Sequence, residues 1–265
     1  EESMIIANIC AAQFLHENLQ CGIFNTHSGF DKKFLENAHN FLLTNLADDE
    51  NKAELQQRYS LENLTSLNGY CQMRHDIESI EGDYLEFRLR RFLTFAEFKA
   101  ELAPHFGLGL KGYATWTSPI RKYSDMVNHR LIKAYLAKRD FAKPEETVLA
   151  RLQEARRQNR LVERDIADWL YCRYLADKVE SKVEFEAEVQ DVTRGGLRVM
   201  LLENGASMFI PASTLHDNRE EITINNDEIA FYIKDQRQYK IGDLIRVQLT
   251  EVKETTRSII GTVLK

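Results

Sequence analysis

The sequence predicts an α+β protein with two regions, in which mixed helices and strands cover residues 1–181 and a small closed β-barrel covers residues 182–265. Before residue 182, long segments repeat apolar residues at the spacing of an amphipathic helix, and short alternating segments lie between them. After it, five short alternating segments are separated by glycine turns, which is typical of an OB-type barrel.

Three helices are expected early in the N-terminal region, at residues 1–18, 31–46 and 60–75. The segment "CGIFNTHSGF" is expected to form a short strand that leads to a glycine turn. Two more strands are expected around residues 92–116, where "FLTFAEFKAEL" alternates and "HFGLGLKGYATW" is glycine-rich and extended.

Two further helices are expected after Pro119 and Pro144. The apolar face of the first consists of Ile120, Tyr123, Val127, Leu131 and Ala134. The apolar face of the second, longer helix consists of Val148, Leu152, Ala155, Asn159, Val162, Ile166 and Leu170. Because strands and helices are mixed along residues 1–181, we expect this region to fold as a single α+β unit.

The composition excludes several classes of protein. Cys10, Cys21, Cys71 and Cys172 are scattered without a CxxC pair, so neither a disulfide framework nor a zinc ribbon is expected, and a reducing cytoplasm is the default. The apolar runs are far shorter than the roughly 20 residues that span a bilayer. The opening segment is already helical and has no initial methionine, which leads us to expect that an upstream portion is missing.

The charge is unevenly distributed along this chain of net charge −6. Residues 88–181 hold 19 Lys and Arg against 12 Asp and Glu, whereas the segments before and after are acidic. A local basic zone can attract a polyanion although the whole molecule is acidic, because salt screens distant charges. The alternative is a solvated helical surface with many i,i+4 ion pairs.

The stretch "TWTSPIRKYSD" lies in this basic zone and resembles a helix start. A serine at the N-cap, Ser118, followed by a proline at N1 would leave the N–H groups of Ile120 and Arg121 free, which favours an anion site. Thr117 would add a hydroxyl, and the guanidinium of Arg121 suits two oxygens of one phosphate. Asp125 could orient Arg121 or balance the neighbouring lysine.

An ordinary capped helix, in which Arg121 pairs with a surface acid, explains the same spacing equally well. Further cations continue along the two helices and could line a groove that follows a nucleic-acid backbone, although many must simply be solvated. They are Arg130, Lys133, Arg139, Arg151, Arg156, Arg157, Arg160 and Arg164.

Three segments in a fixed order, "EESMIIANICAA", "HFGLGLKGYA" and "GYATWTSPIRKYSDMVNHRLIKA", resemble the C-terminal half of the catalytic (RNB) domain of the ribonuclease II family. Members of this family degrade single-stranded RNA processively from its 3′ end. The barrel from Lys182 onward is similar to the S1 RNA-binding domain that closes these proteins. Because the chain ends soon after the last strand, it is most similar to the bacterial exoribonuclease II branch of the family.

The resemblance also implies what this chain lacks. Family members hold catalytic Mg²⁺ with an aspartate cluster that lies upstream of the segments present here, so no metal is expected to bind to this chain. The acids Asp48, Asp49 and Glu50, and those of "DIESIEGD" at residues 76–83, are interpreted as solvated rather than as a substitute cluster. The chain is therefore expected to be a fragment that binds single-stranded RNA weakly and cleaves nothing alone.

The resemblance assigns roles to individual residues. Arg121 is the catalytic residue and contacts phosphate near the scissile bond, while Thr117 and Ser118 position the backbone. Glu1 falls where the family has a glutamate that can hydrogen-bond a terminal base. Arg130 is expected to be one of the residues that bind RNA. Tyr113 packs against sugar or base, or is a buried aromatic at a strand end.

In the barrel, Phe209 and His216 fall where S1 domains place residues that face RNA, and an exposed aromatic offers a base a stacking platform. Burial of Phe209 in the core is the alternative. Leu197 stands where a second aromatic is common, which weakens the platform. His105 and His129 have no partner at metal-ligand spacing and are interpreted as structural or phosphate-facing residues.

These observations predict a cytoplasmic 3′-to-5′ exoribonuclease that releases nucleoside 5′-monophosphates from single-stranded RNA. The alternative is a non-catalytic RNA-binding or assembly module on the same scaffold. A monomer is expected, or a chain that associates with its missing N-terminal portion through the apolar stripe of its first helix.

Overall fold

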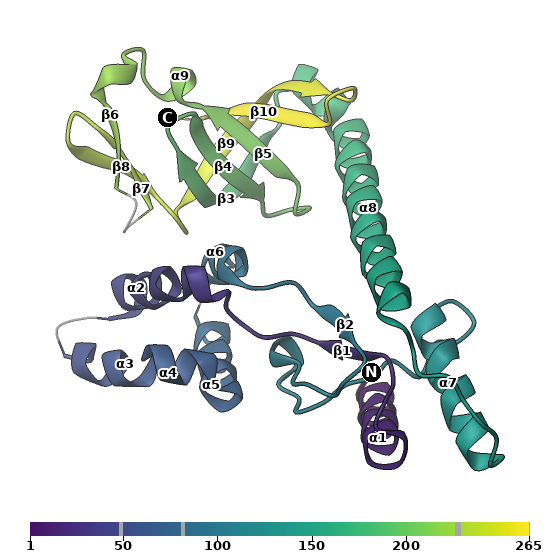
Figure 1. Cartoon of the computed structure of the whole chain (residues 1–265). Helices are drawn as coiled ribbons and strands as arrows, with labels where there is room; N and C mark the ends of the chain where they lie inside the picture. The colour runs from purple at the N-terminus through teal and green to yellow at the C-terminus, as the bar shows by residue number, and fades with distance from the viewer. Residues whose placement is uncertain (48–49, 81–82, 226–228, 265) are drawn as a thin grey trace. The chain divides into compact units, whose positions relative to one another are not determined.

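The computed structural model describes residues 1–47, 50–80, 83–225 and 229–264, and the chain divides into two compact units (Figure 1). The first unit consists of Glu1–His39, Ala53–Asp76 and Phe92–Asn159. The second consists of Asn40–Lys52, Ile77–Arg91 and Arg160–Lys265. Each unit thus joins segments that are distant in the sequence.

Eight helices of the described residues precede the barrel: α1 (Glu2–Leu19), α2 (Leu35–Leu46), α3 (Lys52–Arg58), α4 (Leu61–Thr65), α5 (Leu67–Glu78), α6 (Tyr84–Leu89), α7 (Tyr123–Leu136) and α8 (Glu146–Glu180). Three short 3-10 helices lie among them: η1 (Lys32–Phe34), η2 (Arg90–Phe92) and η3 (Phe106–Leu108). The helices expected at 1–18, 31–46 and 60–75 are confirmed. The last is interrupted at Ser66, whose hydroxyl accepts a hydrogen bond from the backbone N–H of Gly69 and so begins α5 anew.

The first unit contains one short antiparallel pair, β1 (Phe24–Thr26) with β2 (Glu97–Lys99), in which Asn25 lies opposite Phe98. Both strands lie in segments that the sequence predicts to be extended. The prediction of a further strand in the glycine-rich segment before Trp116 is wrong. His105 and Leu110 exchange backbone hydrogen bonds across η3, and Gly109 ends η3 at a φ of 66°, so the chain turns back instead of extending.

The apolar core of the first unit forms where α1 packs against α7. Its buried residues are Ala12, Leu15, Leu19, Cys21, Phe24, Ala114, Leu131 and Ile132. Trp116 and Phe141 pack against its edge. This core therefore holds both ends of the segment that runs through the "TWTSPIR" motif.

Two buried histidines hold the η3 turn against the end of β1. The Nε2–H of His27 donates to the carbonyl of Thr94 at 3.0 Å, and its Nδ1 accepts from the N–H of Gly107 at 2.9 Å, which makes the ring neutral. The ring of His105 lies 5.6 Å from that of His27. Burial lowers the pKa of His27. Burial, and then the repulsion that would arise if both rings were protonated, lowers the pKa of His105 to about 4.

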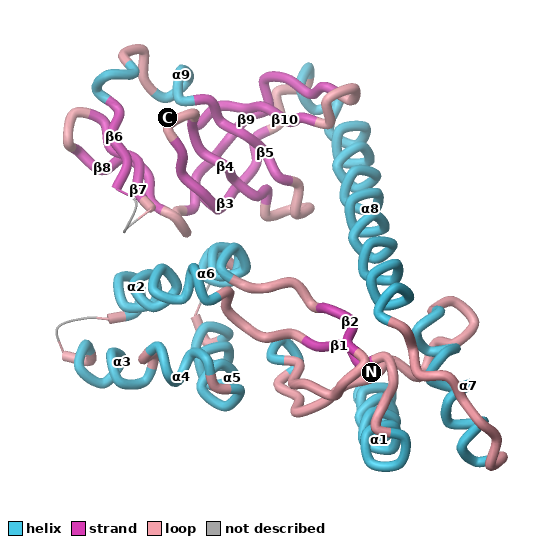
Figure 2. Tube along the Cα trace, viewed as in Figure 1, coloured by secondary structure: helices cyan, strands magenta, loops and turns pink. Residues whose placement is uncertain are grey.

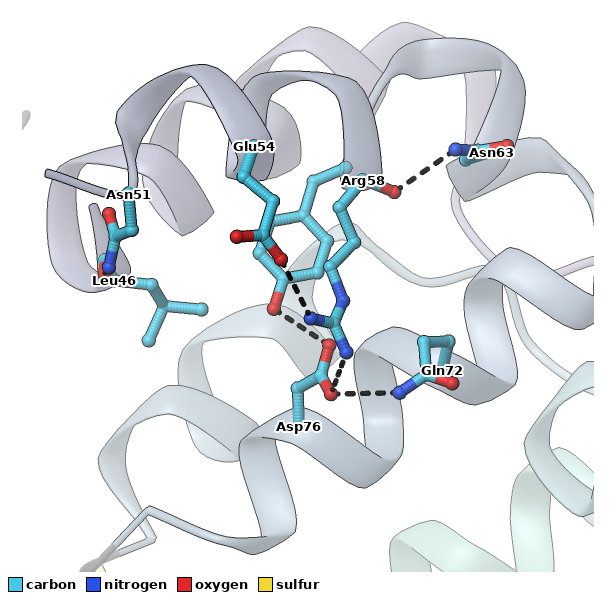
Figure 3. A network of polar contacts seen from close by, with 8 residues as sticks. Leu46, Asn51, Glu54, Arg58, Asn63, Gln72 and Asp76 are labelled. Carbon is cyan, nitrogen blue, oxygen red and sulfur yellow. Dashed lines mark hydrogen bonds and ion pairs between the residues drawn. The ribbon is translucent and has the colours of Figure 1, made fainter.

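A polar network joins α3 to α5 in the first unit (Figure 3). The carboxylate of Asp76 accepts from Arg58 Nη2, Tyr59 Oη and Gln72 Nε2, each at 2.9 Å. Burial, and then the hydrogen bond to Asp76, raises the pKa of the Tyr59 phenol. Asp76, which the sequence places among the solvated acids, is therefore a structural residue.

The second unit contains the predicted barrel, which closes in the order β10-β5-β4-β3-β9 (Figure 2). Its strands are β3 (Glu184–Thr193), β4 (Gly196–Leu201), β5 (Ser207–Pro211), β9 (Leu244–Lys253) and β10 (Ser258–Val263). Side chains alternate between a buried interior and an exposed exterior along β5 and β4. All five expected strands are confirmed. They could be predicted because this alternation of side chains is a strong signal in the sequence.

The barrel is closed by turns that need glycine. Gly196 has a φ of 142°, and a Cβ built there would lie 1.9 Å from the carbonyl oxygen of Ile210. The Asn204-Gly205 turn has a φ of 79° at the glycine, and the Asn204 side chain accepts from the N–H of Ala206. Both turns lie where the sequence predicts them, between the strands that they connect.

One segment of this unit contains regular structure that the sequence analysis did not predict. Between β5 and β9 lie α9 (Ala212–Leu215), η4 (Arg219–Glu221) and a separate three-stranded antiparallel sheet, β6 (Ile222–Asn225), β7 (Ala230–Ile233) and β8 (Gln236–Lys240). The segment is rich in charged and amide side chains, which hides the alternation of Ile222, Ile224 and Phe231.

The apolar face expected for α7 is confirmed only in part, and that expected for α8 is mostly exposed. Leu131 is buried and Val127 packs against the core, whereas Tyr123 and, in the turn before the helix, Ile120 are exposed. The buried set of α7 is Ser124, Asp125, Asn128, Leu131 and Ile132. On α8, Val162, Ile166 and Leu170 are each more than half exposed. None of the described helices is both long enough and apolar enough to cross a membrane.

Candidate functional site

The motif "TSPIR" forms a tight turn instead of the first turn of a helix. The N–H groups of Arg121 and Lys122 both donate to the carbonyl of Ser118, at 3.2 and 3.0 Å. Helix α7 begins only at Tyr123, and Lys122 is its N-cap. The expected N-cap at Ser118 is therefore wrong, and the backbone N–H of Arg121 is not available to an anion.

Asp125 holds this turn from the first turn of α7. Its carboxylate is 1% exposed and accepts from the N–H of Ser118 at 2.9 Å and from the hydroxyl of Ser124 at 3.2 Å. The Ser124 hydroxyl lies 3.0 Å from that of Thr115. Asp125 thus bonds the backbone of the motif, whereas the sequence suggests that it orients Arg121 or balances Lys122.

Asn128, one turn further along α7, is completely buried and uses its whole amide group. Its Nδ2 donates to the carbonyls of Ile23 and Thr115, at 3.0 and 3.2 Å, and its Oδ1 accepts from the N–H of Ile23 at 2.8 Å. One side chain therefore joins α7, the entrance to β1 and the start of the motif.

Asn8 of α1 holds the motif as well. Its Oδ1 accepts from the N–H of Trp116 at 2.8 Å, and its Nδ2 donates to the hydroxyl of Tyr113 at 2.7 Å. His129 stacks on the Trp116 ring with 3.6 Å between ring centroids and donates Nε2–H to the Trp116 carbonyl at 2.8 Å. His129 is therefore structural in this unit, which is one of its two expected roles.

The hydrogen bonds leave the end of the motif accessible. Arg121 and Thr117 are exposed, and Arg121 makes no ion pair with any residue that the structure describes. The expected pairing of Arg121 with a surface acid is thus not seen within the described ranges. Arg130 is exposed two turns along α7, on the side that also carries Tyr123.

The other predicted residues of the first unit lie around the same loop. Tyr113 is partly buried, and its ring lies 6.0 Å from that of His105, in an irregular segment rather than at a strand end. Glu1 is exposed at the N-cap of α1, two turns before Asn8, and its carbonyl accepts from the N–H groups of Met4 and Ile5. Its carboxylate makes no capping hydrogen bond.

The predicted residues of the barrel lie on its outer side. Phe209 is partly exposed between the buried Met208 and Ile210, so the alternative of a core phenylalanine is wrong. The exposed Arg198 is its cross-strand neighbour on β4. Leu197 is fully buried and offers no second platform.

His216 lies just after α9 and is committed to a neighbour. Its Nε2 lies 2.6 Å from the Glu221 carboxylate. The hydrogen bond from His216, and to a smaller extent those from Lys234 and Asn218, lowers the pKa of Glu221. His216 is half-buried and forms its hydrogen bond with a residue of its own loop.

Comparison with known families decides the relationship of this chain. The RNB domain matches residues 1–138, and the S1 RNA binding domain matches residues 178–264. The chain belongs to the RNB family.

The RNB chain is 78% identical over all 265 residues to Exoribonuclease 2 of Haemophilus influenzae, and it spans 40% of that relative's length. It is 75% identical over 261 residues to Exoribonuclease 2 of Mannheimia succiniciproducens, again spanning 40%. A solved structure, Mycoplasma genitalium RNase R in complex with ribose methylated single-stranded RNA, has the same fold, with a TM-score of 0.79 and 21% identity. The match covers 99% of this chain and 40% of that one.

The described residues of the RNB chain do not offer a metal site. No three His, Cys, Asp or Glu residues among them are grouped so that they could hold an ion. Asp76 is engaged by Arg58, Tyr59 and Gln72, whereas Asp48, Asp49 and Glu81 lie outside the described residues. The described acids therefore do not fit the magnesium site that the family resemblance implies.

Sequence reasoning did not foresee how the site is held: it missed Asn8 and Asn128 and gave Asp125 a different role. Asn8, Asp125 and Asn128 together bond the backbone at Trp116, Ser118, Thr115 and Ile23. The available signal was the set of polar residues at positions 124, 125 and 128, which share a helical face with Leu131 and Ile132. The spacing of apolar residues alone does not predict that such a polar face is buried.

Proposed function

We propose that this chain is a portion of a bacterial exoribonuclease that degrades single-stranded RNA processively from 3′ to 5′ and releases nucleoside 5′-monophosphates. Its membership of the RNB family and its identity to relatives named Exoribonuclease 2 support the proposal. The S1 domain adds support for RNA binding. We place the enzyme in the cytoplasm, and we take the RNB and S1 domains as residues 1–181 and 182–265.

The observation that carries the proposal is the exposed Arg121 at the end of a loop whose backbone is held by side chains of both α1 and α7. A guanidinium binds two oxygens of one phosphate, and a fixed backbone lowers the reorganisation that such binding requires. In the transition state, charge spreads over the phosphoryl oxygens, where a preorganised cation stabilises it. Arg121 is therefore the catalytic residue of this chain.

The remaining predicted residues have supporting roles. Thr117 and Ser118 shape the turn, and Ser118 acts through its backbone, since its N–H and carbonyl are both engaged. Tyr113, Arg130 and Glu1 contact the RNA that enters beside α1. The family's Mg²⁺ would be held by carboxylates other than the described ones, and the role of Arg121 does not depend on contact with it.

In the barrel, Phe209 stacks on a base, and Arg198 beside it meets the backbone phosphate. His216 keeps the following loop in place through Glu221 and reaches RNA only at the edge of this platform. The chain acts as a monomer on single-stranded RNA.

The first test incubates the 265-residue chain with 5′-labelled single-stranded RNA, with Mg²⁺ or with EDTA, across a series of salt concentrations. We expect salt-sensitive binding and no shortening of the RNA. Arg121→Ala is expected to weaken binding about tenfold, because hydrogen bonds to charged groups contribute about 1.5–3 kcal/mol. Lys32→Ala, which removes an exposed cation elsewhere in the first unit, is the matched control and is expected to change nothing.

Three outcomes contradict the proposal. Binding that is equal for the wild type, Arg121→Ala and Lys32→Ala would remove Arg121 from RNA recognition. Release of monophosphates with Mg²⁺ but not with EDTA would show that acids of this chain hold the metal, although the described acids form no such group. The absence of any RNA binding would favour an assembly module.

A further inference from the structure

The first turns of α7 bury polar side chains, whereas apolar side chains are exposed at the first residue of the helix and in the turn before it. Ser124, Asp125 and Asn128 are at most 4% exposed, whereas Ile120 is fully exposed and Tyr123 is half exposed. Burying a carboxylate costs several kcal/mol unless hydrogen bonds compensate it. Such a departure from the apolar pattern is expected where a polar group has a task that an apolar residue cannot perform.

The contacts of Asp125 show what this task is. Asp125 occupies the third position of α7, from which an acid in a capping box reaches back to the N–H of the N-cap residue. Here the carboxylate instead accepts from Ser118, four residues before the N-cap Lys122. The hydrogen bond therefore serves the loop and not the helix end.

Ser118 connects this carboxylate to Arg121. Its N–H is held by Asp125, and its carbonyl accepts from the N–H groups of Arg121 and Lys122. Fixing Ser118 therefore fixes the backbone from which the Arg121 side chain extends. Within the described residues no cation pairs with Asp125, so its charge is balanced by these donors and by the positive end of α7.

We propose that Asp125 is a positioning residue, which holds the Ser118 turn so that Arg121 is presented to an RNA phosphate. The proposal rests on the proposed function only for the identity of the ligand. The site requires an acceptor at this position and does not require a negative charge. Asn at position 125 keeps the acceptor without the charge, whereas Glu keeps the charge and displaces it by one methylene.

The test is a double-mutant cycle on the 265-residue chain, with binding of 5′-fluorescein-labelled single-stranded RNA followed by fluorescence anisotropy. Asp125→Ala is expected to weaken binding about tenfold in the wild-type background and less than about twofold in the Arg121→Ala background. In the Phe209→Ala background, Asp125→Ala is expected to weaken RNA binding by the same factor as in the wild-type background, because Phe209 belongs to the barrel. Equal losses in all three backgrounds would overturn the proposal.

Asp76→Ala is the matched control, because Asp76 is also a hydrogen-bonded carboxylate of the first unit (Figure 3). It is expected to lower thermal stability while RNA affinity stays within about twofold. A loss of affinity as large as that of Asp125→Ala would mean that both changes act by general destabilisation, against the proposal.

Two further variants keep the test decisive if Asp125→Ala does not fold. Asp125→Asn is expected to retain most of the affinity, and Asp125→Glu is expected to lose it. The opposite order would show that charge and not position matters, and would overturn the proposal. A purely structural role would affect both variants in proportion to their loss of thermal stability, so both melting temperatures are measured.

Amide hydrogen exchange separates this proposal from the proposed function. If the chain binds no RNA, the proposed function fails, and the backbone amides of Ser118, Arg121 and Lys122 still report on the turn. Protection that is present in the wild type and in Asp76→Ala but lost in Asp125→Ala supports the positioning role. Protection that persists in Asp125→Ala overturns it.

Discussion

The motif loop of the first unit and the outer face of the barrel both carry residues that we propose to contact RNA, but different forces hold them. The loop at residues 113–122 contains no regular structure and is held by buried amide and carboxylate side chains, from Asn8, Asp125 and Asn128. Phe209 is held by the ladder hydrogen bonds of β4 and β5 and by the apolar interior behind it. Loss of one anchor should therefore disturb the loop locally, whereas the barrel should fail as a whole.

The largest expected effect concerns the barrel. Gly196→Ala places a methyl group where the Ile210 carbonyl lies, at a φ that L-residues rarely adopt, and we expect a loss of about 4 kcal/mol or complete unfolding of the barrel. Urea denaturation followed by circular dichroism measures this loss. Gly195→Ala is the matched control, because a Cβ there meets no atom closer than 3.6 Å. Equal stability of the two variants would show that the turn relaxes freely.

The second effect concerns the loop. Asn128→Ala removes three hydrogen bonds and leaves the backbone groups of Ile23 and Thr115 without that partner, so we expect the first unit to lose about 3 kcal/mol. Differential scanning calorimetry is the measurement. The barrel transition should not move, which would distinguish local anchoring from a global effect. A simultaneous shift of both transitions would contradict the contrast between loop and barrel.

The third effect is the pH dependence of the buried histidines. The folded pKa values of His27 and His105 lie below the ordinary value of about 6.5, so the unfolded chain binds more protons. Stability is therefore full above about pH 6.5 and falls towards pH 4, by about 2 kcal/mol. Urea denaturation at several pH values measures the slope. His105→Phe should flatten it, whereas substitution of the exposed His75 by Gln should not.

The smallest effect is on RNA affinity through the barrel. Phe209→Ala removes one stacking platform and should weaken binding of single-stranded RNA by about 1 kcal/mol without changing the melting temperature. Combined with Arg121→Ala, its effect should be additive, because the two residues belong to separate units. Fluorescence anisotropy of the two single variants and the double variant gives the coupling. A clear departure from additivity would mean that the two units read one continuous stretch of RNA cooperatively.

The barrel could be predicted from the sequence because sheet burial follows the alternation of side chains. Met208 and Ile210 point inward and Phe209 outward, as their order in the chain requires. The periodic spacing of apolar residues predicted most helices of the first unit as well, although α3 was not expected. The three-stranded sheet from Ile222 to Lys240 was missed because charged and amide residues interrupt its apolar positions.

The loop could not be predicted in the same way. A serine followed by proline is a good helix start by local rules, yet the Ser118 backbone is held by a carboxylate seven residues later. The predicted apolar face of α7 was right at Leu131 but wrong at Ile120 and Tyr123, because the start of the helix buries the hydrogen-bonded residues Ser124, Asp125 and Asn128 instead. The chemistry of the motif suggested Arg121 as a phosphate-binding residue, but its catalytic role could be proposed only from resemblance, because that role depends on partners that periodicity does not reveal.

The anchors of the loop also determine when this site can exist during synthesis of the chain. Asn128 bonds Ile23 across 105 positions, and Asn8 bonds Trp116 across 108. Forming a contact between residues so far apart in the sequence first costs the entropy of closing a long loop, and only then lowers the free energy of the chain. A ribosome that has released α1, β1 and the motif has therefore not yet produced a formed motif loop. The loop is completed only when α7 has emerged, so Arg121 of a nascent chain cannot reach its final geometry before that point.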